Sequence, residues 1–294
     1  MKSQSAMEYL MTYGWAILII AIVLAALYSL GIFNPNTFAP KASAGSCEVV
    51  RPSGPGTTSD LGREGTCTNM LPKYVATFNG HSSYIVANVI DIPTNSSSRT
   101  ILAWYEESPS ENAQSDIFAY GVLSCNDPQK AYFEIYTNGA GGTFNNDPNI
   151  NAWCTDTTIP VSPNYIEGSW IFVAMEYNGT YQIGYAGYNG KIYKTANQQA
   201  FTTPFSLFYI GHGLDRAYFN GSIANVQIYN RALSTNQITA LYQEGIGGDP
   251  IDLSHLVAWY PLNGNANDYS GNDYNGNAIN VGYSSTWYRT YSAP

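Results

Sequence analysis

The stretch AYFNGSIANVQIYNRALSTNQITALYQEG, residues 217–245, predicts a β-strand that runs through a short turn into a helix. Ser234 and Gln237 have the spacing of a capping box, in which each side chain binds the backbone of the other residue. Gly245 provides a stop signal for the helix. The apolar positions between them form one face, which we expect to pack on the core: Ile238, Leu241 and Tyr242.

The rest of the chain from Lys73 onward alternates apolar and polar residues in short runs. Residues 169–196, SWIFVAMEYNGTYQIGYAGYNGKIYKTA, predict three strands joined at Asn178-Gly179 and Asn189-Gly190. Asn-Gly is the strongest short-range hairpin signal. It recurs throughout this region, at Asn79, Asn138, Asn178, Asn189, Asn220, Asn263 and Asn275. We therefore expect an antiparallel all-β domain.

The order of these segments resembles the successive strands of laminin-G-like domains, which have a concanavalin A-like jelly-roll fold. The resemblance covers about residues 73–245. It rests on the quoted helix-containing stretch and on four others: YVATFNGHSSYIVA, SRTILAWYEES, GSWIFVAMEYNG and FSLFYIGHG. It implies an antiparallel β-sandwich over residues 46–294, of a kind that often binds glycans or proteins.

A further segment occurs out of order. LVAWYPLNGNANDYSGNDYNG, residues 256–276, resembles the stretch that normally opens such a domain, yet here it follows the closing helix. About 40 residues could not bury enough surface to fold alone. We expect a circular permutation, in which residues 249–294 return and complete the sheet. Exchange of this segment between subunits and a disordered tail are the alternatives.

The N-terminal region contains an uninterrupted apolar run from Trp15 to Phe33. At ~1.5 Å per residue this run matches the hydrocarbon thickness of a bilayer. The sequence gives no reason for the helix to stop before Asn34-Pro35, so we predict a hydrophobic helix over residues 4–33. A linker rich in Pro, Ala and Ser follows over residues 34–45.

The residues ahead of this run, KSQSAME at positions 2–8, resemble the class III signal of archaeal type IV pilins. In that family a prepilin peptidase cuts ahead of the helix. The resemblance implies a leader peptide over residues 1–3, cleavage between Ser3 and Gln4, and Glu8 at the fifth position of the mature chain.

Glu8 has a physical role in this interpretation. A carboxylate in apolar surroundings is costly unless it is paired, and such pilins pair it with the free α-amine of a neighbouring copy. Two residues depart from the family pattern: Ser3 replaces the usual Gly or Ala, and Ala6 replaces Ser. The alternatives are an uncleaved membrane anchor and a secretory signal cleaved at Ala42-Ser43-Ala44, for which the apolar core is too long.

Composition points to an extracellular location and against nucleic acid. The chain has 21 acidic and 12 basic residues, whereas phosphate binding requires clustered Lys and Arg. The cysteine spacings match neither redox nor zinc motifs, so we predict two disulfides, Cys47–Cys67 and Cys125–Cys154. Three sequons predict glycosylation sites, at Asn95, Asn178 and Asn220.

No catalytic motif is evident, and we expect a protein that is not an enzyme. Glu106 and Glu107 are adjacent, so on a strand they would point to opposite faces. Four further glutamates are isolated in sequence: Glu134, Glu167, Glu176 and Glu244. A loop rich in Asn and Asp supplies oxygen ligands for a possible Ca²⁺ site, at Asp268, Asp273 and Asn275. Turn chemistry alone also explains those residues.

Together these features predict a subunit of an extracellular type IV pilus-like filament. Its helix polymerises with copies of itself after insertion in the cytoplasmic membrane and processing by prepilin peptidase. Its jelly roll then serves surface adhesion, with surface glycans or proteins as ligands. The alternative is a membrane-anchored, non-polymerising lectin or adhesin.

Overall fold

The computed structural model describes residues 13, 16–25, 72–109, 114–137, 147–152, 155–161, 166, 168–213, 218–292 and 294. The chain divides into two units, Met1–Ala42 with Glu64–Thr66, and Ser43–Arg63 with Cys67–Pro294.

In the N-terminal unit, residues 13 and 16–25 are helical. These residues agree with the helix predicted over residues 4–33, and the other residues of that prediction lie outside the described ranges. No helix within the described residues is both long and apolar enough to cross a membrane. Ser3, Gln4 and Glu8 also lie outside the described residues.

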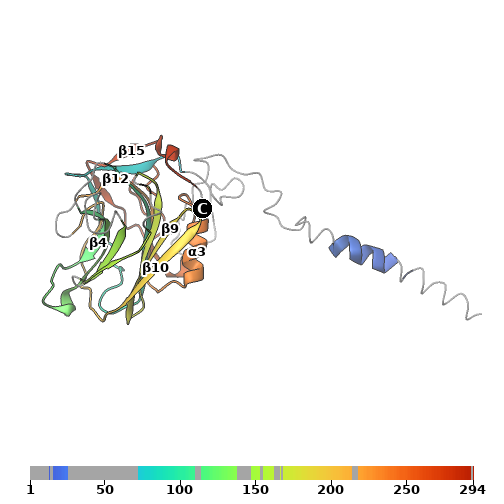
Figure 1. The fold of residues 1–294 in the computed structure, drawn as a ribbon, viewed down its shortest axis with the longest axis horizontal. Coiled ribbons are helices and arrows are strands. Elements are labelled where there is room, and N and C mark those ends of the chain that lie inside the picture. Colours follow the sequence, from blue (N-terminus) through green and yellow to red (C-terminus); the bar gives the residue numbers. More distant parts are fainter. Residues whose placement is uncertain are drawn as a thin grey trace, which may run out of the picture. The chain divides into compact units, whose positions relative to one another are not determined.

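The second unit is a sandwich of two antiparallel sheets (Figure 1). The eight-stranded sheet contains β1 (Val75–Asn79), β3 (Arg99–Glu107), β8 (Ile171–Tyr177), β9 (Tyr181–Tyr188), β10 (Lys191–Gln198), β12 (Asn220–Tyr229), β13 (Leu256–Tyr260) and β15 (Gly282–Ser284). The seven-stranded sheet contains β2 (Tyr84–Ala87), β4 (Ser115–Gly121), β5 (Tyr132–Thr137), β6 (Pro148–Ala152), β7 (Thr155–Thr158), β11 (Phe208–Ile210) and β14 (Asn277–Ile279). The predicted antiparallel jelly-roll sandwich is confirmed.

The C-terminal segment contributes strands to both sheets. In the eight-stranded sheet, in the order β10-β9-β8-β3-β12-β1-β15, β13 pairs with β12 and β15 pairs with β1. In the seven-stranded sheet the order is β14-β2-β11-β4-β5-β6-β7, so β14 forms one edge. Three short 3₁₀ helices complete the described elements: η1 (Pro128–Lys130), η2 (Leu253–His255) and η3 (Trp287–Arg289).

The predicted meander of β8, β9 and β10 is confirmed, with the turns where the Asn-Gly pairs occur. Asn189 and Gly190 both have positive φ, 48° and 73°, as a two-residue hairpin turn with the right twist requires. At the other turn, the Asn178 side chain accepts hydrogen bonds from the backbone N–H groups of Thr180 and Tyr181.

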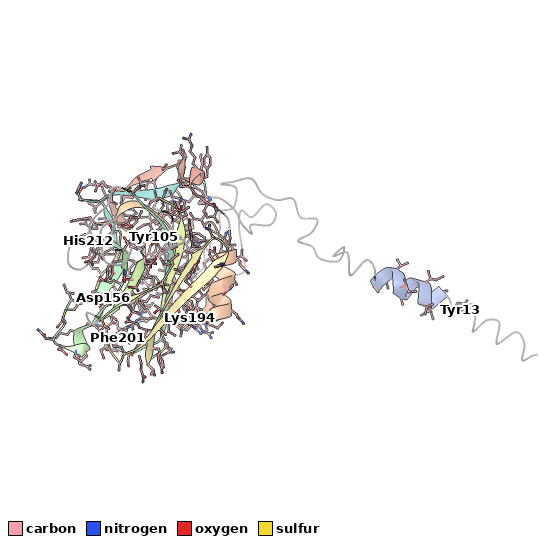
Figure 2. All side chains as sticks on the ribbon, viewed as in Figure 1. Tyr13, Tyr105, Asp156, Lys194, Phe201 and His212 are labelled. Carbon is pink, nitrogen blue, oxygen red and sulfur yellow. The ribbon has the colours of Figure 1, made fainter. Side chains whose placement is uncertain are left out.

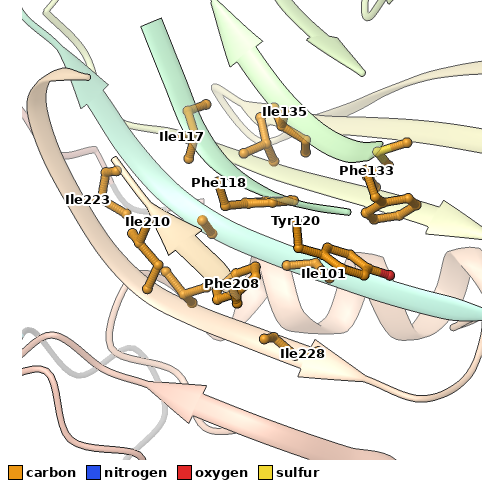
Figure 3. Packing of buried hydrophobic residues seen from close by; sticks show 14 of the residues in the cluster. Ile101, Ile117, Phe118, Tyr120, Phe133, Ile135, Phe208, Ile210, Ile223 and Ile228 are labelled. Carbon is orange, nitrogen blue, oxygen red and sulfur yellow. The ribbon is translucent and has the colours of Figure 1, made fainter. Parts of the chain in front are cut away.

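Two apolar clusters hold the domain together. The larger fills the space between the sheets, where branched and aromatic side chains from facing strands interdigitate (Figure 3). The smaller lies between the outer face of the eight-stranded sheet and α3 (Thr235–Gln243). The capping box of Ser234 and Gln237 is present. The predicted apolar face of α3 is buried, through Ile238, Leu241 and Tyr242.

Candidate functional site

The outer face of the seven-stranded sheet carries a continuous row of paired residues, which we call the outer row. Directly paired residues of antiparallel strands project from the same face. In order across the sheet, the row is Asn277, Val86, Tyr209, Ala119, Glu134, Asn151 and Asp156. Their sequence neighbours, such as Ile85, Phe118 and Phe208, belong to the core. Side-chain alternation thus presents this row away from the core.

A pocket of about 240 Å³ lies at the β5–β7 end of the outer row. Its described lining consists of Gln114, Leu123, Tyr132, Glu134, Tyr136, Asn151 and Asp156. Tyr132, Glu134 and Tyr136 alternate along β5, and for that reason they share one face. They are only 3–5% exposed although they project away from the core.

Asn151 lies in the pocket and joins two of its residues. Its Nδ2 donates to the hydroxyl oxygen of Tyr132 at 2.6 Å and to Oε1 of Glu134 at 3.4 Å. A carboxylate only accepts, so this contact fixes which end of the Asn151 amide is the nitrogen. The other end, Oδ1, is buried and has no hydrogen-bond partner. A buried acceptor without a partner is costly, and a ligand donor in the pocket would satisfy it.

Tyr136 keeps its proton in this environment. Burial raises the pKa of Tyr136 above its ordinary value, and the nearby carboxylates of Asp156 and Glu134 raise it further. The phenol donates its hydrogen bond to Asp156, which is itself exposed on the edge strand β7. The pocket therefore combines two carboxylates, an amide oxygen and tyrosine rings, a mixture suited to a polar ligand with apolar faces.

An aromatic cluster lies on the same face, around β2 and β11. The ring of His212 is 5.4 Å from that of Tyr84, 5.5 Å from that of Tyr209 and 4.4 Å from that of Tyr218, measured between centroids. All four residues are half-buried, so ring edges and faces reach the surface. Tyr209 also belongs to the outer row. His212 in this cluster and Asp156 in the pocket are labelled in Figure 2.

Four strand spacings, about 19 Å, separate β11 from β7. The aromatic cluster and the pocket are therefore two ends of one surface that could accommodate an extended ligand.

Glu134 is isolated from other acids in sequence, but the structure brings it together with Asp156, because both residues line the same pocket. The Y-x-E-x-Y alternation of residues 132–136 was the available signal. That signal alone does not reveal the pocket, because β6 and β7, which pair beside β5 as consecutive strands, are short and polar and carry no distinctive strand pattern.

Glu106 and Glu107 do project from opposite faces, as predicted. Glu107 accepts from Thr137 of the facing sheet, whereas Glu106 bonds to Ser222 and Thr290.

The predicted calcium residues are arranged by loop hydrogen bonds. Oδ1 of Asp268 accepts from the backbone N–H groups of Trp259 and Ser270, and Oδ2 accepts from the hydroxyl of Ser270 and the N–H of Tyr274. Asn275 accepts from the N–H of Asp268 at 2.9 Å.

Asp273, the third predicted ligand, is exposed and has a positive φ of 59°. Among the described residues, no cluster of three or more His, Cys, Asp or Glu could hold a metal. Calcium binding therefore stays a prediction, and turn chemistry accounts for the contacts that Asp268 and Asn275 make.

Of the predicted disulfide residues, Cys125 is disulfide-bonded. Cys47, Cys67 and Cys154 lie outside the described residues, so both pairings stay predictions. The sequon residues Asn95 and Asn178 are exposed, and Asn220 is half-buried in β12 opposite Asn79. Their glycosylation also stays a prediction.

The sandwich and its outer-face pocket define a jelly-roll domain of the lectin-like class. A family profile for a laminin G domain, described as the concanavalin A-like lectin/glucanases superfamily, matches residues 79–239, more than half of the chain. The chain belongs to this family, which confirms the resemblance found for the β-domain. No curated protein matches the chain in sequence.

Several solved structures are similar to this chain at low sequence identity. A Bacteroides ovatus protein, provisionally described as carbohydrate binding, has a TM-score of 0.54 and 19% identity over 76% of this chain. The match spans 62% of that protein. Domain 4 of the Geobacillus stearothermophilus arabinanase AbnA, solved with arabinotriose, has a TM-score of 0.42 and 18% identity, with 56% of this chain and 75% of that chain covered. The Ruminococcus gnavus sialidase module CBM40 bound to sialyllactose has a TM-score of 0.38 and 19% identity, with 56% of this chain and 95% of that one covered.

Proposed function

We propose that the jelly roll binds a glycan along the outer row, with its principal contacts in the β5–β7 pocket. The observation that carries the proposal is the buried Oδ1 of Asn151, which lacks a partner and lines a pocket with tyrosines and carboxylates. The family description, which names lectins and glucanases, supports a saccharide as the ligand.

The chemistry of a sugar matches that of the pocket. Sugar hydroxyls can donate to Asn151 Oδ1 and to the carboxylates of Glu134 and Asp156, and hydrogen bonds to charged acceptors are the stronger kind. The apolar faces of a sugar ring can stack on tyrosine rings, which the pocket and the aromatic cluster both provide. Tyr209 would let an oligosaccharide extend from the pocket toward β2 and β11.

A direct test is binding of the full-length protein, held in a detergent without a sugar headgroup, to an array of oligosaccharides. Asn151→Ala is expected to weaken binding of the best ligand at least about tenfold, because the central amide is lost. Asp252→Asn is the control, since Asp252 pairs with Arg231 and His255 at η2, away from the seven-stranded sheet. Equal affinity of wild type and Asn151→Ala would place the ligand elsewhere.

Binding without hydrolysis is part of this proposal. Glu134 and Asp156 share the pocket, and two opposed carboxylates are also what glycosidases use. The same oligosaccharides should therefore be incubated with the protein and assayed for new reducing ends. Product formation that disappears in Glu134→Gln would show that the pocket is catalytic and would overturn the binding-only assignment.

We further propose that the N-terminal helix assembles with copies of itself into a pilus-like filament that displays the jelly roll. The motif at residues 2–8 and the exposed apolar side chains of the described helix support this idea. Ile17, Ile20 and Ile22 are 65%, 58% and 60% exposed. A helix that is apolar on all sides requires a membrane or other helices around it.

The filament proposal is tested by electron microscopy of filaments sheared from cells, with mass spectrometry of the N-terminal peptide. Filaments whose subunit begins at Gln4, and which are lost in Glu8→Gln, would support it. An uncut N-terminus confined to membranes, with surface display unaffected by Glu8→Gln, would instead favour the membrane-anchored lectin or adhesin.

A further inference from the structure

The β5–β7 pocket is rich in hydrogen-bond acceptors, and several of its described donors are engaged in internal contacts. Three donor groups of the lining show this: the hydroxyl of Tyr136 donates to Asp156, one N–H of Gln114 Nε2 donates to Oδ1 of Asp116 at 3.2 Å, and the Asn151 amide nitrogen is the third. Nδ2 of Asn151 donates to Tyr132 and Glu134. The amide oxygen of Asn151 is left as an acceptor without a partner.

The charges in the pocket have the same sign. Among its described lining residues there is no Lys, Arg or His, whereas Glu134 and Asp156 each bring a carboxylate. Glu134 is 4% exposed, so its charge lies where solvent screens it weakly. Asp156 is exposed on the edge strand and faces an incoming ligand more directly.

These two observations lead to the same conclusion about the ligand. An acceptor-rich surface requires a ligand that donates hydrogen bonds, as neutral sugars do through their hydroxyls. A carboxylated or sulfated sugar adds a negative charge, so Glu134 and Asp156 repel it. Its added groups are also acceptors, which cannot donate a hydrogen bond to Asn151 Oδ1.

We propose that this pocket selects neutral, hydroxyl-rich glycans and rejects anionic ones such as uronates and sialylated chains, and that Asp156 is a specificity-determining residue. The inference rests on the proposed glycan binding at the same pocket. It adds the class of ligand, neutral glycans, and the residue that determines this selectivity, Asp156.

The experiment measures affinity for matched pairs of glycans, lactose with 3′-sialyllactose and oligogalacturonates with their carboxyl-reduced, neutral counterparts of equal length, within a wider array of such pairs. The full-length protein is used in a zwitterionic detergent. In each pair that shows binding, the neutral member is expected to bind at least about tenfold more tightly at low salt. Added salt should reduce this ratio of affinities, because salt screens the repulsion between the acidic glycan and the carboxylates.

Asp156→Asn identifies the source of the selectivity. It keeps a side-chain oxygen that can accept from Tyr136 but removes one charge at an exposed edge, where folding is least at risk. The ratio of neutral to acidic affinity is expected to fall severalfold in this variant, and Asp252→Asn, which removes a charge near η2, should leave the ratio unchanged.

The outcomes separate the two proposals. If wild type binds acidic members as tightly as neutral ones, or if Asp156→Asn leaves a strong preference intact, the selectivity inference is overturned while glycan binding stands. If wild type binds no glycan in the array, the proposed function itself fails, and the inference fails with it.

Discussion

Arg99 places a cation inside the sandwich, where its side chain is fully buried. The guanidinium carbon lies 4.8–5.8 Å from four aromatic ring centroids, those of Tyr120, Phe133, Tyr177 and Phe201. Its nitrogens donate to the carbonyl groups of Asn95 and Ser97 and to the hydroxyl of Thr203. Burial lowers the pKa of Arg99. Aromatic faces and carbonyl oxygens thus replace the solvent around this charge.

We expect Arg99→Met to lower the free energy of unfolding by about 2–3 kcal/mol, because the two carbonyl groups and Thr203 lose a buried donor. Arg231→Met is the matched control, since Arg231 is exposed and its ion pair with Asp252 contributes at most about 1 kcal/mol. Urea denaturation measures both. An Arg99→Met variant as stable as wild type would mean that burying the cation costs as much as its contacts contribute.

Glu176 provides a pH-dependent contribution to stability. Burial raises its pKa, although the hydrogen bond from Tyr185 and the charge of Lys194 act in the opposite direction. A carboxyl whose folded pKa exceeds its unfolded pKa favours folding at low pH, and this contribution is lost as pH rises through the folded pKa. We expect Glu176→Gln to be more stable than wild type at neutral pH, with the difference vanishing below about pH 4. The measurement is urea denaturation of both proteins from neutral pH to below about pH 4. A difference in unfolding free energy between Glu176→Gln and wild type that stayed constant with pH would contradict the expectation.

At the scale of elements, the C-terminal segment is joined to the sheet through a bulge in β12. The register of β12 with β3 shifts between Ala224 and Gln227, and Asn225 there has a positive φ of 51°. The Asn225 side chain accepts from the Trp259 indole at 2.8 Å and donates to the carbonyl of Gly248 at 2.8 Å. Asn225 therefore holds both Gly248, which precedes β13 in sequence, and Trp259, which lies in β13.

The Asp268 loop should stabilise this junction without a metal. Each Asp268 carboxylate oxygen already accepts two hydrogen bonds, so we expect Asp268→Ala to lower the melting temperature by several degrees, corresponding to about 2 kcal/mol. EDTA should leave the wild-type melting temperature unchanged. Asp273→Ala, which alters an exposed side chain of the same loop, is the comparison. A wild-type melting temperature that rises with added Ca²⁺ would support the calcium prediction instead.

The whole β-domain was predictable from its sequence in outline, because its turns and helix use strong local signals. The Asn178-Gly179 and Asn189-Gly190 turns and the Ser234 capping box act over a few residues and appear where predicted. The pocket was not predictable, although β4 to β7 pair as consecutive strands, because two of these strands have weak sequence signals. Asn151 and Asp156 come from short polar strands that carry no distinctive pattern.

The domain as a unit depends on its C-terminal strands. Removing residues 249–294 deletes β13, β14 and β15 and exposes core partners such as Val226 and Ile228. We expect residues 46–248 to lack cooperative unfolding and to bind hydrophobic dyes, whereas residues 46–294 fold. Adding the 249–294 segment as a separate peptide should restore folding. A monomeric, cooperatively folded 46–248 fragment would contradict this expectation.

The pairing of β1 with β15 has a consequence for biosynthesis. Val75 pairs with Ser284, and the N–H of Tyr74 donates to Asn263, so the first and last parts of the domain meet only after nearly all of it has been made. Such high contact order slows folding, and unpaired strand edges expose a nascent chain to aggregation. A ribosome stalled before residue 256 should therefore carry a protease-sensitive chain, and cells that make this protein have reason to keep a chaperone at the site where the domain emerges.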